Sequence, residues 1–311
     1  MLADLQRVPV LQENRVHLIT TRRFAPGARI GAMANFIQQS HPPSMVLSHF
    51  EQAIVEEGEL QAIQPDQVPV DLLQLQYLPK REAKPNPLML EQYYAQLMYG
   101  YQAYVEAVLG DSSTNFKAYV QQVVSCFDDY RILTAIRHGD FGLNKINQQM
   151  EQRFLQASAQ LKQGEWYTGR PVMMTYNDYQ LGLSNGDIGI CFWREQQDQA
   201  QFEVYFPSLE KWVPATRLPK NIETAFALTI HKSQGSEFTH TAVVLDQQAK
   251  SLLSKELIYT AITRAKKVVS LLVDQEAFIQ ALCVRTTRHS GLSLKIIECC
   301  SNLLAKKMKS L

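Results

Sequence analysis

The sequence predicts an α/β protein with a doubly wound, mostly parallel sheet, a helical region and a small inserted β unit. Three observations predict this fold. After residue 219, apolar β-prone runs alternate with helical periodicity. Between residues 86 and 163, apolar residues recur at three- and four-residue spacing. Between residues 170 and 217, short strand candidates are separated by turn-forming residues. The 311 residues, 46% of them hydrophobic, are enough for two or three structural units.

The first part of the chain, residues 1–168, is expected to begin the α/β domain and to hold its helical region. Val16–Thr20 predicts a short strand, and a break after it leads into a helix from about residue 30 to residue 38. Residues 41–85 show no pattern that favours one structure. From residue 86 to residue 163 we expect a packed group of helices.

Residues 169–218 are predicted to form the inserted β unit, because four strand candidates alternate with turns. These candidates are residues 171–176, 189–193, 202–206 and 211–214. Residues 219–292 are expected to complete the α/β domain. Their predicted elements are strands at 224–230, 241–246 and 268–274 and helices at 254–267 and 275–284. This alternation predicts a functional site at the carboxyl ends of the parallel strands.

Composition limits the classes of function. No run approaches the roughly 18 apolar residues of a membrane span, and no signal peptide is visible, so we expect neither a membrane partner nor export. The five cysteines are an odd number without metal-ligand spacing, which favours a reducing cytoplasm and no metal site. A net charge of +1 means that any nucleic-acid contact must come from local groups. Residues 293–311 form a basic tail, interpreted as a solvated helix, a frayed end or a binding element.

The segment from residue 229 to residue 238 combines the end of a buried strand with a polar turn. Residues 225–230 are apolar and β-prone, and the polar residues after them cannot continue a buried strand. Gly235 permits a conformation or a close approach that a side chain would forbid, so nearby amides can face a phosphate or ribose. Glu237 can accept a hydrogen bond from a hydroxyl. Each residue alone also fits an ordinary strand-to-helix loop, whereas the whole string favours contacts with a nucleotide and a nucleic-acid strand.

The predicted helix at residues 254–267 has one apolar and one polar face. Ser254 is a good N-cap, and Lys266 and Lys267 in the last turn suit the helix dipole. Arg264 lies on the polar face. A guanidinium beside a γ-phosphate stabilises the charge that develops during phosphoryl transfer, which is the role of an arginine finger. Without the preceding segment, a solvated surface arginine would be the preferred explanation of Arg264.

These two segments are similar to motifs V and VI of superfamily 1 DNA helicases. Residues 17–24 resemble motif IV, and residues 135–142 resemble a segment typical of the RecD family. Residues 169–189 resemble the start of a small barrel, similar to an SH3 domain, that this family inserts into its second RecA-like domain. The resemblance runs from about residue 16 to residue 292, in the family's order, and it indicates the C-terminal portion of a superfamily 1B helicase of the RecD type.

The resemblance implies a role for each candidate residue. Arg264 and Arg23 are expected to be catalytic and to bind the phosphates of ATP, and Gly235 and Glu237 are expected to lie beside the nucleotide. The implied DNA-binding residues are Thr229, His231, Ser233 and Gln234, whose neutral side chains suit a strand that must slide.

Several of these side chains keep a second interpretation. Outside the motif, His231 would be a hydrogen-bonded structural histidine. Tyr176, Tyr179 and Trp193 fit either stacking surfaces for bases or packing in the core of the barrel.

The sequence departs from the family in one respect. These helicases bind ATP with a Gly-x-x-x-x-Gly-Lys-Ser/Thr loop, and no glycine of this chain is followed by lysine. In the family, a preceding RecA-like domain carries that loop. That domain also makes most of the contacts with ATP and Mg²⁺. We therefore expect this chain to be the second half of the motor, without ATPase activity of its own. It would derive from a truncated gene, from a misplaced start codon or from a functional fragment. Asp246 ends an apolar strand but follows motif V, so we assign it no metal.

Two functions stay open. The family implies the alpha subunit of exodeoxyribonuclease V, an ATP-dependent 5′–3′ DNA helicase that acts in double-strand-break repair and recombination with the RecB and RecC subunits. The alternative is a non-catalytic remnant that binds single-stranded DNA or RecB and RecC without hydrolysing ATP. An unrelated α/β enzyme would need its own nucleophile or metal cluster, and the sequence shows none.

Overall fold

The computed structural model describes residues 24–25, 27–39, 45–46, 48, 50–51, 56–63, 67–78, 86–196, 199–284 and 291–308. It divides into two compact units. Gly27–Val284 form the larger unit, and Met1–Pro26 together with Arg285–Leu311 form the other. The predicted strand at residues 16–20 lies outside the described residues.

The larger unit is built on a six-stranded sheet whose described strand pairs are all parallel. The strands are β1 (Glu56–Glu57), β2 (Leu72–Tyr77), β3 (Tyr130–Thr134), β9 (Ala227–Thr229), β10 (Phe238–Leu245) and β11 (Ala265–Val273). Their spatial order is β1-β2-β11-β10-β3-β9. The central strands are largely buried runs of Val, Leu and Ile, as expected for parallel strands covered on both faces. The predicted α/β fold with a mostly parallel sheet is confirmed.

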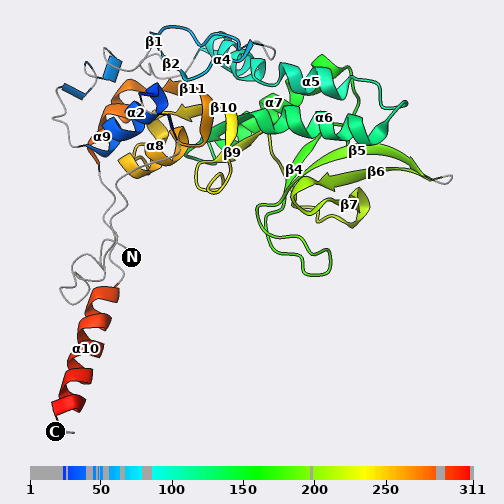
Figure 1. Ribbon diagram of the computed structural model, residues 1–311. Helices are drawn as coiled ribbons and strands as arrows, with labels where there is room; N and C mark the ends of the chain where they lie inside the picture. Colours follow the sequence, from blue (N-terminus) through cyan, green and yellow to red (C-terminus); the bar gives the residue numbers. More distant parts are fainter. Residues whose placement is uncertain are drawn as a thin grey trace. The chain divides into compact units, whose positions relative to one another are not determined.

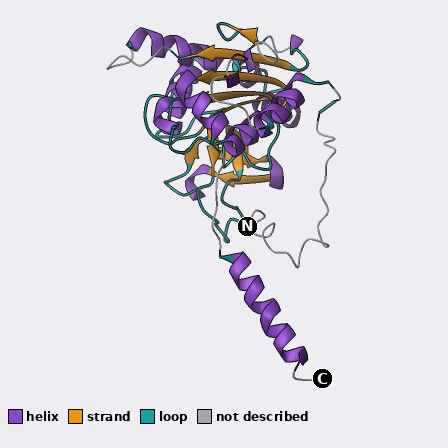
Figure 2. Ribbon diagram, turned by 90° about the vertical axis from the view of Figure 1, so that its left-hand side faces the viewer, coloured by secondary structure: helices purple, strands orange, loops and turns teal. Residues whose placement is uncertain are grey.

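Helices cover both faces of this sheet (Figures 1 and 2). One group comprises α2 (Arg29–Gln38), α8 (Lys255–Ile262) and α9 (Gln275–Cys283), and the other comprises α4 (Pro87–Tyr99), α5 (Gln102–Val108), α6 (Phe116–Asp129) and α7 (Leu143–Ser158). Along β10, Ala242 and Val244 pack into the core beneath the second group. Because side chains alternate along a strand, Val243 and Leu245 face the first group.

An aromatic cluster joins the helical layer to the chain on either side of the β unit. The rings of Tyr104 and Phe127 lie 5.1 Å apart, and those of Tyr101 and Phe226 lie 5.2 Å apart. The Tyr104 hydroxyl donates to the Gly169 carbonyl at 2.8 Å, and the Tyr101 hydroxyl donates to the Phe226 carbonyl. Burial raises the pKa of both tyrosines, so both phenols stay protonated and donate. The helices therefore hold the chain where it enters and where it leaves the β unit.

The β unit is a five-stranded antiparallel sheet with its own core, as the sequence predicts. Its strands are β4 (Pro171–Met173), β5 (Ile188–Gln196), β6 (Gln199–Phe206), β7 (Lys211–Pro214) and β8 (Glu223–Thr224), in the order β7-β6-β5-β4-β8. Its core includes Val172, Cys191, Val204 and Val213. Because β8 pairs with β4, the unit extends past its predicted end at residue 218. Its likeness to an SH3 barrel stays a prediction.

The predicted group of helices contains one central strand of the sheet. Tyr130–Thr134 forms β3, which lies between β10 and β9 and is buried throughout. The run is only five residues long and follows α6 directly, so helical periodicity on both sides conceals it. Parallel pairing with β10 outweighs the local helical pattern at these residues.

The helix predicted at residues 254–267 is shorter than expected. Ser254 caps α8 as predicted, by accepting from the Leu257 amide, but the helix ends at Ile262. The Thr263 hydroxyl donates to the Tyr259 carbonyl at 2.7 Å and so satisfies a carbonyl at the helix end. Lys266 and Lys267 consequently belong to β11, which pairs with β10 from Ala265 onward.

The smaller unit contributes one described helix, α10 (Leu292–Met308). The predicted basic tail is therefore helical over most of its length. None of the described helices combines the length and the apolar character that a membrane span requires.

We predict that His240 makes the stability of the larger unit sensitive to acid. Its ring packs 4.7 Å from that of Tyr130, and its Nε2 lies 2.8 Å from the Ser270 hydroxyl. Burial lowers the pKa of His240 to about 3. In the unfolded chain the pKa is about 6.5, so the unfolded state binds the proton first as the pH falls. The resulting contribution to stability is complete above about pH 6.5 and is lost as the pH falls from there towards 3.

Urea unfolding from pH 7.5 to 4.5 measures this loss. His240→Gln is expected to reduce the slope of unfolding free energy against pH by up to about 1.4 kcal/mol per pH unit. The exposed His231 supplies a control, His231→Gln. Equal slopes for the wild type and His240→Gln would contradict the assignment.

Candidate functional site

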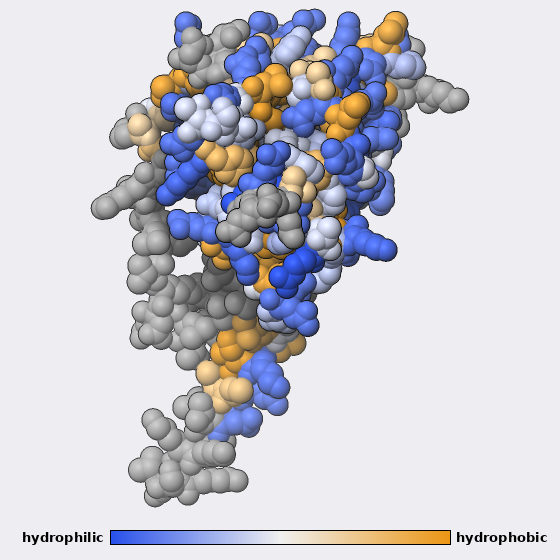
Figure 3. Space-filling model, turned by 90° about the vertical axis from the view of Figure 1, so that its right-hand side faces the viewer, coloured by the Kyte–Doolittle hydropathy of each residue, from blue (hydrophilic) through white to orange (hydrophobic). Residues whose placement is uncertain are grey.

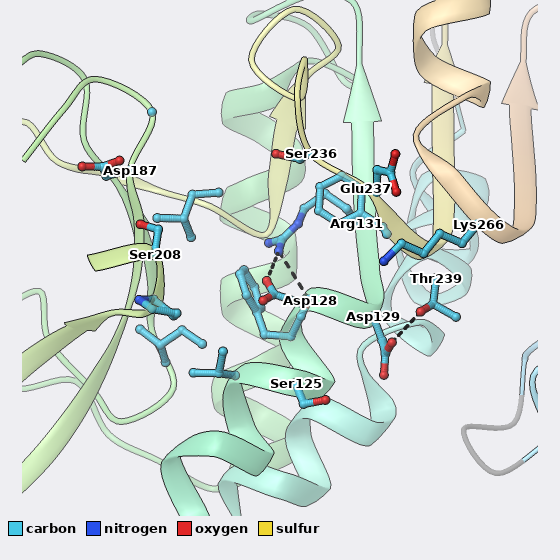
Figure 4. Close-up of a pocket in the computed structure, with 17 residues that line it drawn as sticks. Ser125, Asp128, Asp129, Arg131, Asp187, Ser208, Ser236, Glu237, Thr239 and Lys266 are labelled. Atoms are coloured by element: carbon cyan, nitrogen blue, oxygen red, sulfur yellow. Dashed lines mark hydrogen bonds and ion pairs between the residues drawn. The ribbon is translucent and has the colours of Figure 1, made fainter. Parts of the chain in front are cut away.

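The chain between β9 and β10 crosses the sheet from one edge to the other. Both strands run parallel to β3, which lies between them. β9 therefore ends at the carboxyl edge of the sheet, whereas β10 begins at the amino edge. Residues 230–237, here named the crossing segment, must run back along the sheet between these edges. Figure 4 shows Ser236 and Glu237 where this segment approaches β10.

The first half of the crossing segment is a tight turn after β9. The Thr229 carbonyl accepts from the amides of Lys232 at 2.9 Å and Ser233 at 3.2 Å. His231 and Gln234 are exposed on this turn, where a strand of nucleic acid can reach them. Thr229 is partly buried.

The side chain of Ser233 is not available for DNA, contrary to the expectation from the sequence. The residue is fully buried, and its hydroxyl donates to the Ile230 carbonyl at 2.8 Å. A short hydroxyl side chain in a turn readily bonds to nearby backbone, and here that bond closes the turn. Ser233 thus shapes the segment on which His231 and Gln234 are displayed.

Gly235 adopts a backbone conformation that favours glycine. Its φ is +91°, in the left-handed region, and no atom lies within 4 Å of where a Cβ would stand. The need for glycine here is therefore conformational, which is one of the two reasons that the sequence leaves open. The open space beside Gly235 leaves room for a ligand to approach the backbone.

The Arg264 guanidinium lies against the second half of the crossing segment. Its Nη1 donates to the Ser236 carbonyl at 3.1 Å, and its Nε donates to the Thr260 carbonyl at 3.1 Å. The Arg264 carbonyl in turn accepts from the Phe238 amide at 2.9 Å. Since Ser236 stands between Gly235 and Glu237, the structure brings these two residues and Arg264 together on one rim.

This rim lies at the opposite edge of the sheet from the one predicted. Arg264 immediately precedes β11, and Glu237 immediately precedes β10, so both stand at the amino ends of parallel strands. The rule that places sites at carboxyl ends holds for loops that follow strands. Here the crossing segment has already returned to the amino edge. Only Thr229, at the end of β9, and the turn that follows it with His231 lie at the carboxyl edge.

The remaining predicted residue, Arg23, lies outside the described residues. Asp246 has a structural role, because its side chain accepts from the Gln248 amide and caps a short 3₁₀ turn. No cluster of three or more His, Cys, Asp or Glu that suits a metal ion occurs in the described part of the chain.

A cavity of about 540 Å³ opens beside the rim, between the parallel sheet and the β unit (Figure 4). The β unit contributes Asp187 and Ser208 to one wall. The opposite wall carries Ser236, Glu237 and Lys266. The charged residues that line the cavity are Asp128, Asp129, Arg131, Asp187, Glu237 and Lys266.

Arg131 in this cavity fixes the beginning of β10. The residue is 1% exposed, and its guanidinium lies 3.7 Å from the centre of the Phe127 ring and 5.0 Å from that of Phe238. Its Nη1 donates to the Ala225 carbonyl at 3.1 Å, whereas its Nε has no partner within the described residues. Arg131 thus links Ala225, which lies before the crossing segment, to Phe238, which follows it.

Sequence reasoning missed Arg131 and Lys266. The sequence pattern predicts helices around Arg131 and places Lys266 in the last turn of a helix. Recognition of β3 and of the early start of β11 would have found both, because these strands place them at the same edge as Glu237.

A second contact ties the crossing segment to the β unit. Lys232 donates from Nζ to the Asn185 side-chain carbonyl in the loop between β4 and β5. The crossing segment is therefore held at one end by Arg264 and near the other by the β unit.

Comparison with known proteins finds a similarity to helicases in the part of the chain that holds this site. Residues 224–272, which include the crossing segment and Arg264, match the family described as the UvrD-like helicase C-terminal domain. A Pif1 helicase from Bacteroides, solved with ADP-AlF3 and single-stranded DNA, is a structural neighbour at 16% identity with a TM-score of 0.35. It aligns over 74% of this chain and 57% of that chain. The matched segment, residues 224–272, is therefore similar to a helicase C-terminal domain.

Curated relatives of this chain include RecD subunits and a RecD2 helicase. The RecBCD enzyme subunit RecD of Haemophilus influenzae is 37% identical over 186 residues, or 58% of this chain and 27% of that protein. The RecD subunit of Mycobacterium tuberculosis is 34% identical over 173 residues, or 56% of this chain and 30% of that protein. The ATP-dependent RecD2 DNA helicase of Deinococcus radiodurans is 30% identical over 138 residues, 44% of this chain and 19% of that protein.

Over its matched part, this chain is related to the RecD helicase subunits and corresponds to their C-terminal portion. The aligned region covers about a quarter of the length of these relatives, as the 27% share of the Haemophilus influenzae protein shows.

We predict that Gly235→Ala lowers the free energy of unfolding by about 1 kcal/mol, because an L-residue in the left-handed region is strained. No clash adds to this cost, since the space beside Gly235 is open. Chemical denaturation measures the change. Gln234→Ala, an exposed neighbour in the same turn, serves as the control and is expected to stay within about 0.5 kcal/mol of wild type. A Gly235→Ala variant as stable as wild type would show that the turn does not need glycine.

Proposed function

We propose that this chain is the second motor half of an ATP-dependent 5′–3′ DNA helicase of the RecD type. In this proposal it supplies one wall of a composite nucleotide site, and a preceding RecA-like domain supplies the phosphate-binding loop. The observation that carries the proposal is the hydrogen bond from Arg264 to the Ser236 carbonyl, which holds an arginine beside Gly235 and Glu237.

The rim has the chemistry that the far wall of an ATP site needs. Open space beside Gly235 admits a phosphate or ribose to the backbone, and the exposed Glu237 carboxylate accepts from a ribose hydroxyl. Arg264 contributes a planar fork of donors that suits phosphate oxygens. ATP and Mg²⁺ would be held mainly by the preceding domain, and Arg23 would contribute a second guanidinium.

The Arg264 hydrogen bonds define what happens when a nucleotide arrives. Nη1 donates to the Ser236 carbonyl, and a γ-phosphate that took the same N–H group would replace a neutral acceptor with a charged one. Charge-assisted hydrogen bonds are roughly twice as strong as neutral ones, so the exchange favours the phosphate.

The first half of the crossing segment is the DNA side of the motor. His231 and Gln234 are exposed and neutral, and the closed turn that Ser233 and Thr229 form beneath them fixes their positions. Contacts of this kind hold a nucleic-acid backbone without reading its sequence. The crossing segment thereby links the DNA contacts at one edge of the sheet to the nucleotide contacts at the other.

The family relationship supports a wider role in double-strand-break repair and recombination. The relatives of Haemophilus influenzae and Mycobacterium tuberculosis are named as RecBCD subunits. We propose RecB and RecC as partners of this chain and the cytoplasm as its location.

A non-catalytic role is the second candidate. The sequence has no glycine followed by lysine, so the chain alone carries no phosphate-binding loop of this type. A polypeptide of this composition would bind single-stranded DNA, or RecB and RecC, without hydrolysing ATP.

We predict that the 311-residue chain binds single-stranded DNA but shows no DNA-stimulated ATPase. Replacing both His231 and Gln234 by alanine is expected to weaken binding roughly tenfold, because two polar contacts to the backbone are lost. Fluorescence anisotropy with a labelled oligothymidine measures the affinity, and a phosphate-release assay measures hydrolysis. Gln92→Ala, an exposed glutamine on α4, is the control. Hydrolysis by the chain alone, or unchanged affinity of the double variant, would contradict the prediction.

The role of Arg264 is tested in a chimera that joins the N-terminal motor domain of the Haemophilus influenzae relative to this chain. Arg264→Ala is expected to lower DNA-stimulated ATP turnover by roughly 10³, the range of arginine fingers, with little change in the fold. Arg217→Ala changes an exposed arginine of the β unit and is expected to leave turnover unchanged. Near-normal turnover of the Arg264→Ala chimera would remove Arg264 from the mechanism.

A further inference from the structure

The loop between β4 and β5 carries a tyrosine whose exposure is at odds with its surroundings. Tyr179 is 89% exposed, whereas Leu181 and Leu183 in the same loop are buried in the core of the β unit. Among the described residues, none forms a hydrogen bond or a ring contact with Tyr179. Of the three aromatic residues singled out from the sequence, Tyr179 is the most exposed, whereas Trp193 packs on Phe202 at 4.9 Å between ring centres. Packing in the core therefore does not account for Tyr179.

The backbone on either side of Tyr179 is firmly held. The Asp178 carboxylate accepts from the amides of Gln180 at 3.0 Å and Leu181 at 2.9 Å, which forms a tight turn around Tyr179. Asp178 and Leu183 also exchange two backbone hydrogen bonds, at 2.7 and 2.9 Å. Lys211 donates from Nζ to the Leu181 carbonyl at 2.5 Å. Tyr179 therefore stands on a rigid base and projects into solvent.

A continuous set of contacts joins this loop to the crossing segment. The Asn177 side chain accepts from the Asn185 amide at 2.8 Å, and the Asn185 side chain accepts from Lys232 Nζ. Lys232 is flanked by His231, one of the exposed residues proposed to contact DNA. The loop that displays Tyr179 is thus fixed relative to the proposed DNA contacts.

We propose that Tyr179 is a stacking platform for a base of single-stranded DNA, and that the β unit thereby extends the DNA contact surface beyond the crossing segment. This inference rests on the proposed function, because it needs a DNA strand at His231 and Gln234. Every base presents a flat π-face, so stacking on tyrosine is compatible with any sequence and with a strand that moves. Because the loop is already ordered, binding loses little conformational freedom there.

The chain around Tyr179 favours a polar strand rather than an apolar protein surface. Polar character is not confined to this loop, since hydrophilic residues predominate on the described part of the face shown in Figure 3. The residues next to Tyr179 in the chain are Asn177, Asp178 and Gln180. An interface with a protein partner is usually centred on a broader apolar patch.

A comparison of intact and abasic DNA tests this proposal with the full chain. Affinities are measured by fluorescence anisotropy for an oligothymidine and for an oligomer of equal length that has abasic sites throughout. Tyr179→Ala is expected to weaken binding of the intact oligomer about 5-fold or more, the range of base–aromatic stacking, and to leave abasic binding unchanged. Tyr179→Phe keeps the ring and is expected to bind as wild type does. Tyr99→Ala, on α4, is the control because Tyr99 is 48% exposed.

The possible outcomes separate this proposal from the proposed function. If the wild-type chain binds neither oligomer, the proposed function fails, and the stacking platform fails with it. If the wild type binds but Tyr179→Ala binds equally tightly, only the stacking platform is overturned. An equal loss for intact and abasic oligomers also overturns it, because stacking requires a base. Loss for the intact oligomer alone, restored in Tyr179→Phe, supports it.

Discussion

The parallel direction of β9, β3 and β10 is the constraint on which the site depends. Two parallel strands cannot be joined by a tight hairpin, so the chain that leaves Thr229 must return to the opposite edge before β10 begins at Phe238. In many folds a long helix makes this return. Here a short polar segment makes it, and that segment therefore presents side chains at both edges of the sheet. Residues separated by only a few positions in sequence can thus contact two different ligands.

The sequence predicted the elements whose patterns are long and regular. The helix at α2, the helix at α9 and the antiparallel unit between α7 and β9 all follow from periodicity and turn residues. The elements it missed are decided by tertiary pairing. β3 is too short to show a period of its own, and β11 begins at Ala265 because Phe238 is there to pair with it. Periodicity describes local preference and carries no information on which strand is adjacent.

Local sequence patterns also limit what can be predicted about the candidate site. The glycine at position 235 and the arginine at position 264 belong to short motifs, and the structure places them together through the Ser236 carbonyl. Motifs do not specify the depth of a side chain, so the burial of Ser233 was not foreseeable. Nor does any local pattern mark Arg131, whose position in the cavity results from the meeting of α6, β3 and β10. Sequence thus marks candidate groups, whereas packing decides which of them are accessible.

The two ends of the β unit are adjacent in space. Thr224 pairs with Val172, the Ala225 amide donates to the Pro171 carbonyl at 3.0 Å, and neighbouring tyrosines of the helical layer hold Gly169 and Phe226. The unit is therefore an insertion whose two ends lie together, and a short link in its place would leave the parallel sheet intact. Such an arrangement lets the loops of the inserted unit vary in length and composition while the parallel sheet keeps its geometry. The two parts can then diverge at separate rates within one polypeptide.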